Sequence, residues 1–175
     1  NCFLLFYNII TIYQMSQTID LLIKNGSCFI DGKLEKVDLA VNNSQIQEIG
    51  KLKNLEGKSE VDAKNLLVLP GVIDTQVHFR EPGSTEAEDL NSGSKAAILG
   101  GVTSVFDMPN TNPPTSSKKE FFSKLELAKN RMFCNYAFYF GATPENSNEL
   151  RELKNLEGCC GIKLFAGSST GNLLV

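Results

Sequence analysis

Several features that define whole classes of protein are missing from this sequence. It has no basic run, and its net charge of -3 argues against nucleic acid as the main partner. Its five cysteines are an odd number without C-x-x-C spacing, which argues against a disulfide framework or a zinc knuckle and favours a reducing cytoplasm. Cys159 and Cys160 are expected to be small buried hydrophobes in a strand. No apolar run reaches the roughly 20 residues that span a bilayer, so no membrane partner is expected. Histidine occurs once, as His78.

What is present is ordinary for a globular chain: 42% of the 175 residues are hydrophobic and 21% are charged. Residues 1–14 need separate treatment, because they begin without methionine and Met15 follows them directly. Their apolar stretch lacks the positively charged start and the small-residue cleavage site of a secretory signal. We expect them to be a non-native extension upstream of a true start at Met15; a genuine extension is the alternative.

Residues 15–66 are rich in turns. Short apolar runs lie near residues 19–23, 28–30, 37–41 and 46–49. The dipeptides between these runs are typical of hairpins and turns: Asn25-Gly26, Asp31-Gly32 and Asn42-Asn43. The pattern predicts a small antiparallel sheet. Such a sheet is too small to be stable alone, so we expect it to pack on the residues that follow.

Residues 67–175 follow a different rhythm. Strand-like apolar segments begin about 30 residues apart, near Leu67, Val102, Met132 and Gly161. The segments between them carry helix signals, which are the possible capping boxes Thr85-x-x-Glu88 and Ser117-x-x-Glu120 and the cap Thr143-Pro144. Strands that alternate with helices predict βα units and a parallel sheet. Four units are half of a (β/α)8 barrel, which needs about 250 residues in total; a complete open sheet is the competing interpretation.

One predicted strand, "GVIDTQVHF", carries the histidine. The period of two in a strand places Gln76 and His78 on one face, and Val77 and Phe79 on the other. Two side chains at positions i and i+2 can hold one metal ion from the same side. A lone histidine is more often structural than a metal ligand. Whether His78 is structural or a ligand therefore depends on the residues of the loop that follows it.

Three further side chains lie where strands of a parallel array end, which is where functional groups gather. Arg80 follows His78 by two residues, and its planar guanidinium suits a carboxylate or a phosphate. Asn110 lies in a proline-bounded loop, where it either forms a turn or binds a ligand. Lys163 lies within an apolar segment, where it pays a desolvation cost unless it is paired or chemically changed; a snorkelling edge lysine is the alternative.

The sequence resembles dihydroorotases of the amidohydrolase superfamily in three motifs: "LPGVIDTQVHFREPG", "AAILGGVTSVFDMPNTNPPT" and "GIKLFAGSSTGNLLV". The resemblance covers roughly residues 16–175 in order and spacing. Hydantoinases and allantoinases share the first motif, whereas the pairing of Arg80 with "MPNT" is similar to dihydroorotase. The resemblance implies the N-terminal half of a (β/α)8 TIM barrel at residues 67–175. It implies a segment of a composite β-sandwich at residues 15–66.

The resemblance also implies a function. It is the interconversion of N-carbamoyl-L-aspartate and dihydroorotate in pyrimidine biosynthesis, with one or two Zn2+ ions that activate water. By position, His78 is a metal ligand, and Lys163 is the lysine that is carboxylated to bridge two metals. Arg80 and Asn110 match the residues that bind the carboxylate of this small-molecule substrate. A homo-oligomer and a pathway partner enzyme are the candidate assemblies of the intact protein.

Two departures from the family pattern concern the metal site. The family has H-x-H where this chain has Gln76-Val77-His78, and a neutral amide oxygen binds zinc less well than imidazole does. We therefore expect Gln76 to be a weak ligand and one metal position to be weak or empty. The family's two further histidines and its general-base aspartate come from later strands, beyond residue 175. The chain is therefore expected to be an N-terminal fragment that is inactive alone.

Two other functions remain open. The first is another cyclic amide hydrolase, of the hydantoinase or allantoinase kind. The second is a non-catalytic dihydroorotase-like subunit that supports a partner enzyme, with Gln76 as a sign of lost metal chemistry. The presence of His78 and Lys163 argues against this second function, because a site without chemistry has no need of a buried lysine.

Overall fold

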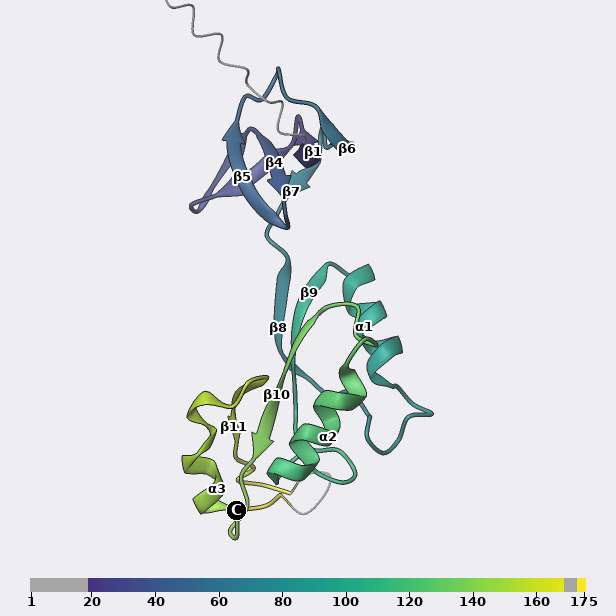
Figure 1. The fold of residues 1–175 in the computed structure, drawn as a ribbon, viewed down its shortest axis with the longest axis vertical. Coiled ribbons are helices and arrows are strands. Elements are labelled where there is room, and N and C mark those ends of the chain that lie inside the picture. The colour runs from purple at the N-terminus through teal and green to yellow at the C-terminus, as the bar shows by residue number, and fades with distance from the viewer. Residues whose placement is uncertain (1–18, 169–172) are drawn as a thin grey trace, which may run out of the picture. The chain divides into compact units, whose positions relative to one another are not determined.

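The computed structural model describes residues 19–168 and 173–175, so the expectation for residues 1–14 lies outside the described residues. The chain forms two compact units (Figure 1). The first ends at Pro70, and the second extends from Gly71 to Val175. No helix within the two described ranges is long and apolar enough to cross a membrane.

The first unit contains two small sheets. One has the strand order β5-β4-β1-β6, and the other has the order β3-β2-β7. The strands are β1 Ile19–Lys24, β2 Ser27–Ile30, β3 Lys33–Lys36, β4 Asp38–Asn42, β5 Gln45–Gly50, β6 Gly57–Asp62 and β7 Leu67–Val68. The core of this unit is formed by Ile19, Leu22, Ala40 and Leu52, with Leu55 packed against it.

The antiparallel sheet predicted for this region is only partly correct. β4 pairs with β1 and β5 in antiparallel orientation, but β6 pairs with β1, and β7 with β2, in parallel orientation. Asp31-Gly32 forms the expected two-residue hairpin turn between β2 and β3, with a positive φ at both residues. Asn25-Gly26 instead connects strands of different sheets, and the turn after β4 lies at Asn43-Ser44.

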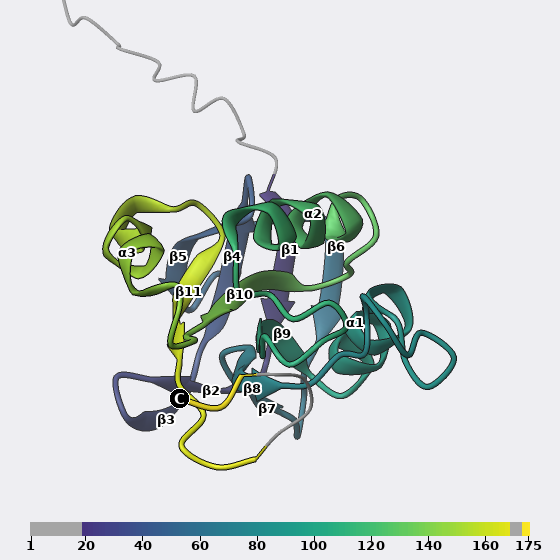
Figure 2. The same cartoon turned by 90° about the horizontal axis from the view of Figure 1, so that it is seen from below.

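The second unit is an α/β fold around a parallel sheet with the strand order β11-β10-β9-β8. Its strands are β8 Val72–Val77, β9 Val102–Asp107, β10 Asn135–Gly141 and β11 Cys159–Lys163. Its helices are α1 Leu90–Leu99, α2 Lys118–Ala128 and α3 Ser147–Arg151, with a 3-10 turn at Leu153–Asn155. The predicted alternation of strands and helices is confirmed. α1 and α2 lie on the same face of the sheet, as Figure 2 shows together with Figure 1.

The start of α1 differs from the prediction. The helix begins after Asp89, whose side chain accepts a hydrogen bond from the Ser92 amide while the Ser92 side chain accepts one from the Asp89 amide. This reciprocal pair replaces the predicted pair of Thr85 and Glu88, because aspartate is the stronger N-cap. The helix ends at Gly100 as expected.

The other two helices differ in how they begin: α2 has a side-chain cap, and α3 has none. Ser117 caps α2 as predicted, since its side chain accepts a hydrogen bond from the Glu120 amide. The cap predicted at Thr143-Pro144 is wrong, because α3 begins after Asn146. The Oδ1 atom of Asn146 accepts a hydrogen bond from the Thr143 amide, which holds that segment outside the helix.

Three phenylalanines form the centre of the core between the sheet and α2. Phe121, Phe138 and Phe140 are completely buried, and the ring centroid of Phe121 lies 6.5 Å from that of Phe138 and 6.1 Å from that of Phe140. Burial of each side chain contributes about 1.5–3 kcal/mol. Leu90 of α1 and Val105 of β9 belong to the same core. The helices are thereby fixed against the sheet, which in turn fixes the ends of the strands.

The strand predicted to begin near Leu67 is divided in two. Leu67–Val68 form β7 and pair with β2 in the first unit, whereas β8 begins at Val72 in the second. Pro70 lies between them, and proline cannot donate the hydrogen bond that a continuous strand would need. β8 and β11 are the edges of the parallel sheet, and both expose apolar side chains, among them Ile73 and Ile162.

Candidate active site

β8 and β9 end next to each other, and their loops bring together two of the predicted site residues. The Nδ1 atom of His78 lies 2.8 Å from Oδ1 of Asn110. Asn110 is buried and His78 is half-buried. Because an amide oxygen only accepts hydrogen bonds, Nδ1 of His78 is the donor, and in the neutral ring Nε2 keeps its lone pair. A metal ion or a proton donor can therefore be bound through Nε2.

The backbone on both sides of His78 is held by the end of β9. The Met108 amide donates to the Val77 carbonyl at 3.0 Å, and the Phe79 amide donates to Oδ1 of Asp107 at 2.9 Å. Val77 and Phe79 both pack in the helix-covered core and so share one face, as the period of two predicted. The two peptide groups that flank His78 are thus both fixed.

A buried ion pair lies next to this junction. The Nζ atom of Lys124, on α2, is 2.7 Å from Oδ2 of Asp107, and neither side chain is exposed. The contact is electrostatic and not a well-directed hydrogen bond. Nζ also donates to the Met108 carbonyl at 3.3 Å and lies 4.8 Å from the centre of the Phe138 ring. Burial raises the pKa of Asp107 and lowers the pKa of Lys124, while each charge opposes the shift of the other.

This ion pair was not among the predicted site residues, although the sequence carries a signal for it. Lys124 lies on the same helical face as Phe121 and Ala128, which are both buried. A lysine at such a position needs a buried carboxylate partner. Asp107 is the acidic residue at the end of the neighbouring apolar strand.

Arg80 and Asn110 line one small pocket with a volume of about 50 Å³, together with Pro82, Ser84, Thr111 and Asn112. Arg80 is exposed, and no carboxylate of the described residues forms an ion pair with it. A guanidinium without a carboxylate partner at the rim of a pocket is available to an anionic ligand.

The two loops that form this pocket are in direct contact. The Asn112 amide donates to the Pro82 carbonyl at 2.9 Å. Gly83 has a φ of 127°, and a Cβ atom there would lie 3.1 Å from Cβ of Asn112. Any other residue would be strained in this conformation, and its Cβ atom would require Asn112 to shift.

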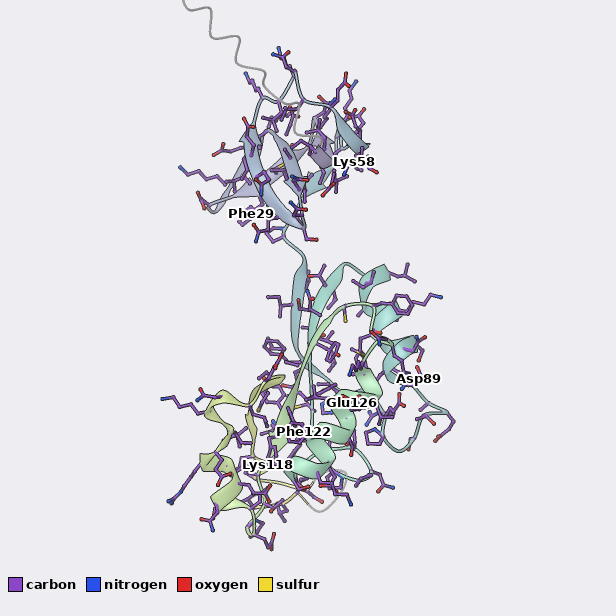
Figure 3. All side chains as sticks on the ribbon, in the orientation of Figure 1. Phe29, Lys58, Asp89, Lys118, Phe122 and Glu126 are labelled. Carbon is purple, nitrogen blue, oxygen red and sulfur yellow. The ribbon has the colours of Figure 1, made fainter. Side chains whose placement is uncertain are left out.

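Glu81 joins the loop after β8 to the start of α1 and to the segment that follows α2. Its carboxylate binds Arg131 through two contacts, of 2.8 Å and 3.0 Å, and accepts a hydrogen bond from the Leu90 amide at 3.0 Å. Arg131 also donates to the Leu127 carbonyl at 3.0 Å and lies 3.7 Å from Asp89, which Figure 3 labels at the start of α1. Arg80 is therefore next to a firmly held residue, even though its own side chain is exposed.

No hydrogen bond among the described residues joins Gln76 to the other predicted site residues. Its side chain is exposed, and its amide donates to Oδ1 of Asp74 at 3.0 Å. The pairing of β8 with β9 is irregular between Asp74 and Val77. β8 therefore has a bulge directly before the histidine, a feature that is frequent next to active sites.

Lys163 lies at the end of β11, the edge of the sheet opposite β8. It is half-buried, and its Nζ atom lies 5.1 Å from the centre of the Phe165 ring. Three strand spacings separate the two edge strands, which is about 14 Å in a flat sheet. Lys163 and His78 can share a ligand only where the sheet is strongly curved.

The described residues contain one side chain that is oriented as a metal ligand would be, but not a complete metal centre. His78 fits a ligand role, because metal-bound histidines donate their second ring nitrogen to a partner, as Nδ1 does here to Asn110. Within residues 19–168 and 173–175, however, no group of three His, Cys, Asp or Glu side chains is placed to hold a metal ion. No catalytic step through a metal can be assigned to these residues alone.

The sequence of this unit matches a known protein family. The match covers residues 67–163 and is to the amidohydrolase family. The chain belongs to the amidohydrolase family. The matched range contains His78, Arg80, Asn110 and Lys163. The likeness to dihydroorotases that the three motifs indicated is confirmed by relatives in that family.

Individual amidohydrolase relatives carry different names. A dihydroorotase from Methanosarcina mazei is 38% identical over 155 residues, which are 88% of this chain and 34% of that protein. An allantoinase from Rubrobacter xylanophilus is 39% identical over 155 residues, which are 87% of this chain and 33% of that protein. The structure of an L-hydantoinase from Arthrobacter aurescens superposes with a TM-score of 0.82 at 26% identity, covering 90% of this chain and 35% of that one. The chain spans about a third of the length of the relatives it matches.

Proposed function

We propose that this chain forms the N-terminal part of a metal-dependent cyclic amide hydrolase of the dihydroorotase type. The observation that carries the proposal is the shared pocket of Arg80 and Asn110, with Asn110 also bonded to His78. A carboxylate bound in this pocket would place the rest of a small substrate beside the imidazole ring. The named relatives support a cyclic amide as that substrate.

Asn110 can serve both the histidine and the substrate. Its Oδ1 atom is occupied by Nδ1 of His78, so its Nδ2 group keeps two hydrogens to donate. The guanidinium of Arg80 offers two parallel donors, which match a carboxylate. Dihydroorotate and N-carbamoyl-L-aspartate both carry such a carboxylate, which is not part of the amide bond that reacts.

The proposed metal is zinc, with Nε2 of His78 as the best-oriented ligand of this chain. Lys163, in carboxylated form, and Gln76 are its proposed further ligands. A metal ion at such a site supplies an activated water and polarises the amide carbonyl. Because β8 and β11 are opposite edges of the sheet, we propose that the sheet curves as the first half of a (β/α)8 barrel. The first unit is proposed to be a segment of a β-sandwich.

Two other functions have specific support. Sequence identity does not separate a dihydroorotase from an allantoinase, since the relatives are 38% and 39% identical. A non-catalytic subunit is favoured by Gln76, which stands where the dihydroorotase pattern has a histidine. Arg80 favours the dihydroorotase type over both, because neither a neutral substrate nor a lost activity needs a free guanidinium in the pocket.

The full-length protein, loaded with Zn2+, decides between these functions. Turnover of dihydroorotate, allantoin and hydantoin is measured under the same conditions. The proposal predicts the highest kcat/KM with dihydroorotate. A preference for allantoin or hydantoin would assign one of the other hydrolases, and a folded, metal-loaded protein that turns over none of the three would support the non-catalytic subunit.

A further inference from the structure

The buried pair of Asp107 and Lys124 holds parts of both loops that carry the site. Oδ1 of Asp107 accepts the Phe79 amide at 2.9 Å, one residue after His78. Nζ of Lys124 donates to the Met108 carbonyl at 3.3 Å, two residues before Asn110. The two side chains that meet in the site therefore have backbones that are tied to one ion pair.

The ion pair of Asp107 and Lys124 is unusual because it is completely buried in the core. Both side chains have no solvent exposure, so both charges are fully desolvated. Buried ion pairs are not efficient stabilisers, because replacing both partners with apolar residues of similar size is often neutral or favourable. The core around Phe121 and Phe138 would accept such residues. Stability alone is therefore a weak reason for a lysine and an aspartate at these positions.

We propose that Asp107 and Lys124 are positioning residues, which hold His78 and Asn110 in contact and thereby keep the proton of the imidazole on Nδ1. The role rests on the proposed function, because it leaves the Nε2 atom of His78 free for a ligand. Asp107 acts through the Phe79 amide, and Lys124 acts through the Met108 carbonyl while it neutralises Asp107. Neither residue lines the pocket of Arg80 and Asn110.

The chain offers a direct reporter, since His78 is its only histidine. In a chain labelled with 15N-histidine, one imidazole gives all ring-nitrogen signals, and these signals identify the nitrogen that carries the proton. The measurement is made on the neutral ring, at a pH above which the ring-nitrogen signals no longer change. The parent chain is expected to show the Nδ1–H form alone. A parent chain with its proton on Nε2 would overturn the proposal.

The deciding variant is the double substitution Asp107→Leu and Lys124→Met, which removes both anchors without leaving a buried charge. The proposal predicts a folded chain in which most of the imidazole has moved to the Nε2–H form. A folded double variant that keeps the Nδ1–H form would overturn the proposal. Phe121→Leu is the matched control, because it disturbs the same core without touching either anchor, and it should keep the parent tautomer.

A second measurement on the parent chain does not depend on the folding of any variant. If Asp107 holds the Phe79 amide, this amide exchanges with solvent as slowly as the paired amides of β9. Exchange at the rate of an exposed loop amide would overturn the proposal.

These measurements need neither metal nor substrate, so their outcome does not depend on whether the proposed function is correct. If the full-length protein hydrolyses no cyclic amide, the proposed function is contradicted, but the tautomer result is unaffected. An unchanged tautomer in the double variant would end the positioning role and leave the hydrolase proposal intact.

Discussion

His78 and Asn110 are 32 residues apart in the sequence, and their side chains meet at 2.8 Å where β8 and β9 end. The contact fixes one imidazole nitrogen as a donor and leaves the other open. Nε2 is therefore the ring nitrogen that can bind a metal ion or a substrate.

Removal of the Asn110 side chain should weaken the metal site. Asn110→Ala takes away the acceptor for Nδ1, so the imidazole can place its proton on Nε2 and block the ligand position. Loss of such a supporting hydrogen bond lowers metal affinity by about 10- to 100-fold. Zinc affinity of the full-length protein measures the effect. Asn112→Ala is the control, because the bond from Asn112 to Pro82 uses only the backbone amide. Equal losses in the two variants would contradict this account.

Arg131→Met should destabilise the second unit. It leaves the carboxylate of Glu81, which is only 8% exposed, without its cationic partner. We expect a loss of about 1–3 kcal/mol in the free energy of unfolding. Lys129→Met is a matched control on the same segment, because its ion pair with Glu126 is exposed and contributes about 0–0.5 kcal/mol. Chemical denaturation of both variants checks the difference, and similar losses would show that Glu81 does not depend on Arg131.

The first unit should lose stability in acid. Hydrogen bonds and ion pairs hold the pKa values of three of its carboxylates below their ordinary values: Asp20 with Lys58, Glu60 with Lys24, and Asp62 with Asn25 (Figure 3 labels Lys58). A carboxyl with a lowered folded pKa stabilises the fold above its unfolded pKa, and this contribution is lost as the pH falls through the folded value. The loss therefore begins near the ordinary values, 4.5 for Glu60 and 3.8 for Asp62, and is complete below the lowered ones.

Amide exchange of β1 and β6 as a function of pH measures this acid response. Asp62→Asn should make the dependence flatter, because its folded-state hydrogen bonds no longer depend on ionisation. Asp31→Asn, in the exposed hairpin turn, is the control and should leave the profile unchanged. A profile that is equally steep in the Asp62 variant would contradict the assignment.

Cys160 should be chemically inert in the folded chain. Burial, followed by the neighbouring Cys159, raises the pKa of its thiol to about 12. Only the thiolate reacts with alkylating reagents, so its reactive fraction at pH 8 is about a thousandfold smaller than that of an ordinary cysteine. Timed alkylation with peptide mass spectrometry should label Cys160 rapidly only after unfolding. Rapid labelling in the native chain would contradict the raised pKa.

The parts of the fold with local signals could be predicted from the sequence. The turn at Asp31-Gly32 and the cap at Ser117 each depend on residues within four positions of one another. β6 was missed because its sequence GKSEVD is largely polar and is a strand only through its pairing with β1. The start of α1 was misplaced because two nearby motifs both fit a cap, and aspartate is the stronger of them.

The site shows the same division between local and distant signals. His78 and Asn110 could be placed together because the ends of neighbouring parallel strands lie at one edge of a sheet. For Asp107 and Lys124 the sequence shows only that a lysine on a buried helix face needs a carboxylate partner, whereas the identity of that partner depends on how α2 packs against β9.

The most direct test of the account is the selectivity of the Arg80→Ala variant of the full-length protein. The kcat/KM for dihydroorotate is compared with that for hydantoin, which has no carboxylate. Loss of a charged hydrogen-bonding pair predicts a decrease of about 10- to 100-fold for dihydroorotate and little change for hydantoin. An equal decrease for both substrates, or no decrease for dihydroorotate, would contradict the role of Arg80 as the carboxylate-binding residue.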